Sequence, residues 1–185
     1  MPNDRMGLAV KMTRADLEGL PQFELPAPYS LRLYDAGDKA NWVTIHELSD
    51  DLQIVTPETF DKSFAGDEAG LKQRQYYLCD GNGAAIGTAT AWYDDPAIGR
   101  VHWVAIVPAH QGRGLSKPLL AAVCNRLREL GHSHAVLGSN TGRVAAIGLY
   151  LKFGFRPVID SDEDRTAWAL MREKLPDSPL GKMDL

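Results

Sequence analysis

The segment 108–116 has the composition of a turn that binds phosphate. It contains Gly112 and Gly114, and it precedes a segment with the apolar period of a helix. The first amides of a helix lack intrahelical acceptors and lie at the positive end of the helix dipole, so they bind anions. Glycine lets the backbone approach a bulky diphosphate closely. Three or four charge-assisted hydrogen bonds of about 1.5–3 kcal/mol each would approach the ~8 kcal/mol of a micromolar ligand.

Two common phosphate motifs do not match this turn. A P-loop needs Gly, four residues and then Gly-Lys-Ser or Gly-Lys-Thr, and no such spacing surrounds Gly112. The dinucleotide fingerprint needs a third glycine three residues after the second, and Lys117 stands there instead. We therefore expect a different kind of diphosphate ligand, with Arg113 adding a charge contact.

The turn resembles the coenzyme A motif of the GCN5-related N-acetyltransferases (GNAT). In that family Gln or Arg, two residues, Gly, one residue and then Gly or Ala follow a strand that ends in Val and Pro. The matching residues here are Gln111, Gly114 and Ser116, preceded by Val107 and Pro108. Ser116 replaces the family's final Gly or Ala.

A second segment carries the same resemblance. Residues 145–155 are similar to the family's second signature helix, which ends in Leu-Tyr, three residues and then Gly-Phe. The resemblance implies an acyltransferase that uses acetyl-CoA to acetylate a primary amine of a small molecule or peptide. A domain that binds acyl-CoA without turnover, as a sensor or structural partner, is the competing hypothesis.

The resemblance also implies where the coenzyme lies. Its diphosphate would bind the amides of residues 112–116, and its pantetheine would pair with the main chain of residues 105–107 like an added strand. The implied coenzyme-binding residues are Ala105, Ile106, Val107, Gln111, Gly112, Arg113, Gly114, Leu115 and Ser116. Arg143, near the start of the second helix, could contact a phosphate or be a surface residue.

Acetyl transfer passes through an oxyanion and expels a thiolate, so the site needs an amide donor near the carbonyl and an acid near the sulfur. We expect the Val107 amide in the first role and the Tyr150 hydroxyl in the second. A phenol with a pKa of about 10, against about 8.5 for a thiol, is protonated at pH 7 and can donate as the thiolate leaves. The alternative is that Tyr150 is only a core residue beside Leu149 and Phe153.

The central strand supplies no evident general base. Side chains two apart share a face of a strand, and the positions with the parity of Val107 are Val101, Trp103 and Ala105. None of these can take a proton. His102 has the opposite parity and would face the other side unless a bulge intervenes.

Several other groups are alternative candidates for the general base. A water chain, or an amine that arrives neutral, is an equal alternative. For the acceptor pocket we expect Trp103 as an apolar wall, with His46 and Asp94 as polar contacts. The side chains considered as the base are His46, Glu47, Glu58, Asp94 and Asp95.

Length and composition predict one domain with one core, since the chain has 185 residues and is 44% hydrophobic. The net charge of −4 without a basic run argues against nucleic acid or an anionic membrane as a partner. Cys79 and Cys124 are expected to be buried, reduced thiols, and no metal-ligand spacing involves them. With no apolar run of ~20 residues and no signal-peptide core at the start, we expect a cytoplasmic monomer or homodimer.

The predicted fold class is α/β: one GNAT-like domain with a mixed, mostly antiparallel sheet of about six to seven strands and helices on both faces. Residues 1–28 are expected to form an N-terminal extension packed on the surface, with a helical turn capped by Thr13. Residues 29–175 form the acetyltransferase domain, and residues 176–185 a frayed tail. The expected strands are 29–34, 75–80, 84–93, 101–107, 134–137 and 166–171, and the expected helices are 38–48, 116–130, 145–153 and one that begins at Pro57.

Overall fold

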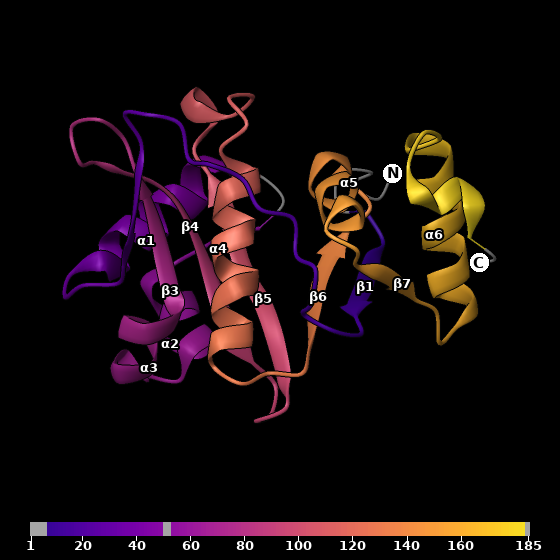
Figure 1. Ribbon diagram of the computed structural model, residues 1–185, viewed down its shortest axis with the longest axis horizontal. Coiled ribbons are helices and arrows are strands. Elements are labelled where there is room, and N and C mark those ends of the chain that lie inside the picture. Colours follow the sequence, from indigo (N-terminus) through magenta and orange to yellow (C-terminus); the bar gives the residue numbers. More distant parts are fainter. Residues whose placement is uncertain (1–6, 50–52, 184–185) are drawn as a thin grey trace.

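The computed structural model describes residues 7–49 and 53–183, and in these residues the strands form one seven-stranded sheet in the order β2-β3-β4-β5-β6-β1-β7 (Figure 1). The strands are β1 (Ala9–Arg14), β2 (Ser30–Leu33), β3 (Gln75–Cys79), β4 (Ala85–Tyr93), β5 (Ile98–Ile106), β6 (His134–Asn140) and β7 (Arg156–Val158). The helices are α1 (Asp38–Ser49), α2 (Pro57–Phe64), α3 (Glu68–Arg74), α4 (Ser116–Glu129), α5 (Val144–Lys152) and α6 (Asp162–Lys174), with short 3-10 turns η1 (Pro108–His110) and η2 (Pro179–Lys182).

The sheet is mixed and mostly antiparallel, as predicted. Every described pair of neighbouring strands is antiparallel except β5 and β6, which run parallel. That parallel pairing covers only residues 98–100 of β5, against residues 134–136 of β6. Beyond it the two strands separate (Figure 1), so the edge of β5 that faces β6 is open from Val101 onward.

Helices cover both faces of the sheet. Helix α4 packs on β3, β4 and β5 through one core cluster that includes Leu119, Leu120 and Leu127. Helix α1 packs on β4 and β5 at the other face, where Trp42 belongs to a second cluster. We call this second cluster, with Trp42, Phe60, Phe64 and Tyr77 as its large rings, the aromatic cluster.

Local signals for helix ends are confirmed. Thr56 caps α2, because its hydroxyl accepts from the Thr59 amide, and Pro57 occupies the first turn. Phe60 and Phe64 share one face of α2, with ring centroids 4.9 Å apart. Gly131 follows α4 with a φ of +86°, a left-handed conformation that favours glycine.

The expectation for residues 9–14 is wrong. They form β1, which lies inside the sheet between β6 and β7 rather than on the surface, and Thr13 belongs to this strand instead of capping a helix. Val10 and Met12 are buried while Ala9 and Lys11 are exposed, which is the two-residue period of a strand. Pairing with two distant strands overrides the local helix signal.

The expected strand at 166–171 is also wrong, because these residues lie in α6. Ser161 caps this helix by accepting from the Asp164 amide at 3.1 Å, and three acidic residues occupy its first turn. Six residues that are apolar on both faces fit a buried strand, but the complete helix buries one stripe with a helical period. The buried residues of α6 are Ala167, Trp168 and Met171.

The C-terminal segment is not frayed within the described residues. It turns back through η2, where the Leu180 side chain is fully buried. Ser178 accepts from the Leu180 amide at 3.3 Å, and Arg172 donates to the Met183 carbonyl. An apolar anchor and a capped turn therefore hold this segment on the domain.

Replacing Trp168 with alanine is expected to lower the free energy of unfolding by about 3–5 kcal/mol, since the ring is fully buried between α6 and the core. Ala169→Ser, one position along on the exposed side of α6, is the control and should have little effect. Chemical denaturation of both variants measures the difference. A cost for Trp168→Ala close to that of the control would contradict the burial of Trp168 in the core.

Candidate active site

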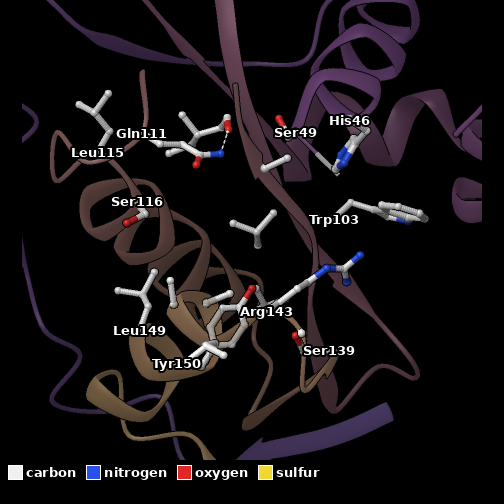
Figure 2. A pocket seen from close by; sticks show the side chains of 18 of the residues that line it. His46, Ser49, Trp103, Gln111, Leu115, Ser116, Ser139, Arg143, Leu149 and Tyr150 are labelled. Carbon is white, nitrogen blue, oxygen red and sulfur yellow. Dashed lines mark hydrogen bonds between the residues drawn. The ribbon is translucent and has the colours of Figure 1, made fainter. Parts of the chain in front are cut away.

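A pocket of about 770 Å³ opens where β5 and β6 separate (Figure 2). Its walls come from β5, the turn before α4, the end of β6, the start of α5 and the end of α1. The residues that line it include His46, Ser49, Gln53, His102, Trp103, Val104, Ala105, Ile106, Gln111, Gly112, Gly114, Leu115, Ser116, Ser139, Arg143, Leu149 and Tyr150.

A bulge interrupts β5 beside the pocket. The register with β4 shifts between Thr88 and Thr90, so that Trp103 and Val104 together oppose Ala89. Trp103 has a φ of +50°, which is rare for a residue with a large side chain. The extra residue shifts the alternation of side chains by one position, so residues before and after the bulge do not follow the same parity.

The bulge overturns the parity expected for this strand. His102 and Trp103 both reach the aromatic cluster, with the His102 ring 5.9 Å from Phe64 and the Trp103 ring 4.9 Å from Trp42. Val101, expected on the same side as Trp103, is instead buried in the core that α4 covers. His102 therefore lies in the pocket wall, although its parity in the strand predicts the opposite side.

The main chain of β5 presents different groups to the pocket than we expected. The Val107 amide donates to the Ile86 carbonyl at 2.9 Å, so it is not available to an oxyanion. Backbone groups of successive strand residues point to opposite edges, so Ala105 also faces β4, whereas Ile106 and Val104 face the open edge. The Ile106 carbonyl accepts from Gln111 Nε2 at 2.7 Å, which agrees with this direction. Two expectations are therefore corrected. The main chains of Ala105 and Val107 face β4 and not the coenzyme, and the Val107 amide does not have the oxyanion role.

The turn before α4 presents unpaired amides. Gly112 and Gly114 have φ values of +72° and +78°, and a Cβ atom on either would meet no atom within 4 Å. Among the described residues, the amides of residues 112–116 donate to no protein acceptor, and Leu115 at the start of α4 has no side-chain cap. These donors, at the positive end of the α4 dipole, fit a diphosphate group.

A family model described as "Acetyltransferase (GNAT) family" matches residues 42–155, which is more than half of the chain. The chain belongs to this family. GNAT enzymes use acetyl-CoA to acetylate amine acceptors.

The curated relatives of this chain include proteins named mycothiol acetyltransferase. The one from Renibacterium salmoninarum is 31% identical over 149 residues, which cover 74% of this chain and 43% of the relative. The one from Arthrobacter sp. (strain FB24) is 38% identical over 159 residues, which cover 79% of this chain and 48% of the relative. The chain therefore spans about half the length of these relatives.

A solved structure supports the fold of this chain. The crystal structure of a GCN5-related N-acetyltransferase from Sphaerobacter thermophilus superposes with a TM-score of 0.69 at 18% sequence identity. The superposition covers 82% of this chain and 49% of that chain. None of the described helices is both long enough and apolar enough to cross a membrane.

Tyr150 is 7% exposed and lines the pocket, with its hydroxyl directed toward the middle of the pocket (Figure 2). Burial raises the pKa of Tyr150 to about 12, while the nearby Arg143 cation opposes this shift. The phenol is therefore protonated at neutral pH and retains a proton that it can donate.

His46 lies at the opposite side of the pocket. It is 3% exposed, its ring lies 4.4 Å from Trp42 and 5.1 Å from Trp103, and its Nε2 has no hydrogen-bond partner among the described residues. Burial lowers the pKa of His46 to about 3, and the charges of Arg143 and His102 add to this shift. Burial likewise lowers the pKa of His102 to about 4, so both imidazoles are neutral at pH 7.

Arg143 precedes α5, and its side chain extends toward Trp103 and His46 rather than toward the turn at 112–116 (Figure 2). This direction agrees with its electrostatic effect on His46. Arg143 thus lies in the pocket, but on the side away from the proposed diphosphate.

Besides Val107, two expected site residues do not line the pocket. Asp94 is exposed and forms an ion pair with Arg100, which keeps its carboxylate at the end of the β4–β5 hairpin. Arg113 donates to the Tyr29 hydroxyl at 2.9 Å and to the Ala109 carbonyl at 3.0 Å. Arg113 therefore braces the turn instead of projecting into the pocket.

The other candidates for a base are exposed and lie outside the pocket: Glu47, Glu58 and Asp95. Sequence reasoning missed several residues that line it, among them Ser49, Gln53, Val104 and Ser139. For Val104 the signal would have been the strand alternation after a bulge. For Ser49, Gln53 and Ser139 the sequence contains no motif that marks them.

Proposed function

We propose that this protein transfers an acetyl group from acetyl-CoA to a primary amine of a small molecule or peptide. The observation that carries the proposal is the set of unpaired amides at 112–116, which lies beside the open edge of β5. Anion donors and an unpaired strand edge together suit a ligand with a diphosphate and an extended, amide-containing arm. Acetyl-CoA supplies the acetyl group as a thioester.

The order of groups along β5 suggests the role of each. Gln111 donates to the Ile106 carbonyl and so links the turn to the end of β5. Of the β5 groups at the open edge, the Ile106 main chain is therefore nearer than Val104 to the diphosphate and to the pantetheine arm attached to it. Val104 is two residues further along, next to Trp103, and its amide faces the same open edge. We assign the Val104 amide to the carbonyl oxygen, where negative charge develops during the transfer.

Tyr150 is assigned as the acid. Its protonated hydroxyl, directed into the pocket, donates a proton to the sulfur as the C–S bond breaks. The part of the pocket that contacts the acceptor amine is formed by His46, His102 and Trp103. The name of the curated relatives makes the acceptor of the mycothiol acetyltransferases a reasonable first compound to test.

The test is to incubate the purified protein with acetyl-CoA and a panel of primary amines that includes that acceptor. Free thiol and acetylated amine are measured together, since both must appear in equal amounts. Tight binding of acetyl-CoA without thiol release for any amine would instead favour a domain that binds acyl-CoA without turnover.

A further inference from the structure

The pocket contains a buried acceptor or donor atom that the described residues leave without a partner. Nε2 of His46 is one of six such side-chain atoms in the described structure, and of the residues that carry them only His46 and Trp103 line the pocket. Buried polar atoms without a partner are rare, because each costs about 1–3 kcal/mol. A bound molecule that reaches this atom from the pocket and completes the hydrogen bond would explain why a residue of the pocket wall leaves it unpaired.

The aromatic cluster fixes the imidazole in place. His46 stands on the last turn of α1 between the rings of Trp42 and Trp103, both within 5.1 Å of it. Trp103 is itself held by the bulge in β5. The direction of Nε2 is therefore set by packing from two elements, as required of a group that orients a substrate.

The charged and titratable groups that act on His46 are Arg143 before α5 and His102 on β5. Both disfavour a second positive charge there, and burial disfavours it more. An imidazole in this environment stays neutral at physiological pH. It accepts a hydrogen bond, but it is a poor base for an ammonium proton.

We propose that Nε2 of His46 accepts a hydrogen bond from the acceptor amine and orients it, and that the amine must enter the pocket uncharged. This inference rests on the proposed acetyl transfer. The amine nitrogen forms the new C–N bond and releases one proton to water, while the sulfur takes the electron pair of the broken C–S bond and one proton from Tyr150, which regains a proton from water. His46 ends the reaction as it began, so it is a positioning residue and not the base.

The first test is the pH dependence of kcat/KM for the amine. Because only the neutral amine reacts, the profile should rise with the amine's own pKa. Two acceptors, an α-amine with a pKa of about 7.8 and an alkylamine with a pKa of about 10.4, should give midpoints more than two pH units apart. A midpoint near pH 6–7 that stays fixed for both amines would mean that an enzyme base controls the rate, and would overturn the proposal.

The second test compares variants. His46→Phe keeps an aromatic ring but removes the acceptor, and it should lower kcat/KM for the amine by about tenfold without changing acetyl-CoA affinity. His46→Asn retains an acceptor atom and should recover part of this loss. Glu47→Gln, the next residue on the exposed side of α1, is the control and should behave as wild type. Wild-type kcat/KM in His46→Phe would overturn the proposal.

A third measurement separates this inference from the proposed function. If the wild-type protein releases thiol, the kinetic tests decide the role of His46. If it releases none, the proposed function fails, and ¹⁵N-histidine NMR with coenzyme A and the amine panel decides. The Nε2 resonance of His46 should then move on addition of an amine, and an unmoved resonance would overturn the proposed contact.

Discussion

Replacing Gly114 with glutamate is expected to weaken acetyl-CoA binding by at least about 100-fold, the loss of one or two charge-assisted hydrogen bonds with added repulsion. Gly114 has a φ of +78°, and a Cβ there would point into open space in front of the unpaired amides. The new carboxylate would compete with the diphosphate for these donors and repel it. Isothermal titration calorimetry with acetyl-CoA measures the change.

Gly131→Glu is the matched control for this prediction. Gly131 also has a positive φ, of +86°, and a Cβ there would also meet no atom within 4 Å. It follows the C-terminal end of α4, so the backbone strain and added charge are similar but the pocket is at the opposite end of the helix. Unchanged affinity in Gly114→Glu, or equal loss in both variants, would contradict a diphosphate site at 112–116.

Replacing Tyr150 with phenylalanine is expected to lower kcat by about 100-fold, the lower end of the usual effect of a general acid. The affinity for acetyl-CoA should remain nearly unchanged, since the hydroxyl acts on the leaving sulfur and the ring still fills its place. Steady-state thiol release and calorimetry on the same preparation separate the two effects. A wild-type kcat would remove Tyr150 from the mechanism.

The pH dependence of kcat gives a second measure of the role of Tyr150. Because burial raises the pKa of Tyr150 to about 12, its proton is retained up to ~pH 10, and Tyr150 should cause no fall in kcat below that pH. Tyr76→Phe is the control: burial also raises the pKa of this phenol, but it stands on β3 outside the pocket. A fall in kcat below pH 10 that is absent from Tyr150→Phe would show that Tyr150 loses its proton earlier than expected, and would contradict its raised pKa.

The features that could be predicted from the sequence are those set by neighbouring residues. The glycine-rich turn, the helices that begin at Pro57 and Ser116, and the hairpin between β3 and β4 depend on caps, on positive φ values and on apolar period. The motif residues Gln111 and Gly114 line the pocket, as the family resemblance implied. The family and the mixed sheet followed from these local patterns.

The features that could not be predicted depend on which strand lies beside which. Residues 9–14 carry a weak helix signal, and only pairing with β6 and β7 makes them a strand. The bulge at Trp103 arises from the pairing with β4, and it moves His102 to the pocket side of β5. The same pairing uses the Val107 amide and leaves Val104 and Ile106 facing the open edge.

By itself, the sequence determined that the chain bends sharply at 108–116 and begins a helix there, because glycine dihedrals and helix starts are local properties. The tertiary structure alone decided which side chains and amides meet the ligand, because strand register and burial come from distant partners. His46 illustrates the difference: in the sequence it is one histidine on a helix. Its burial between Trp42 and Trp103, with Nε2 unpaired among the described residues, is what makes it a neutral group suited to orient an amine.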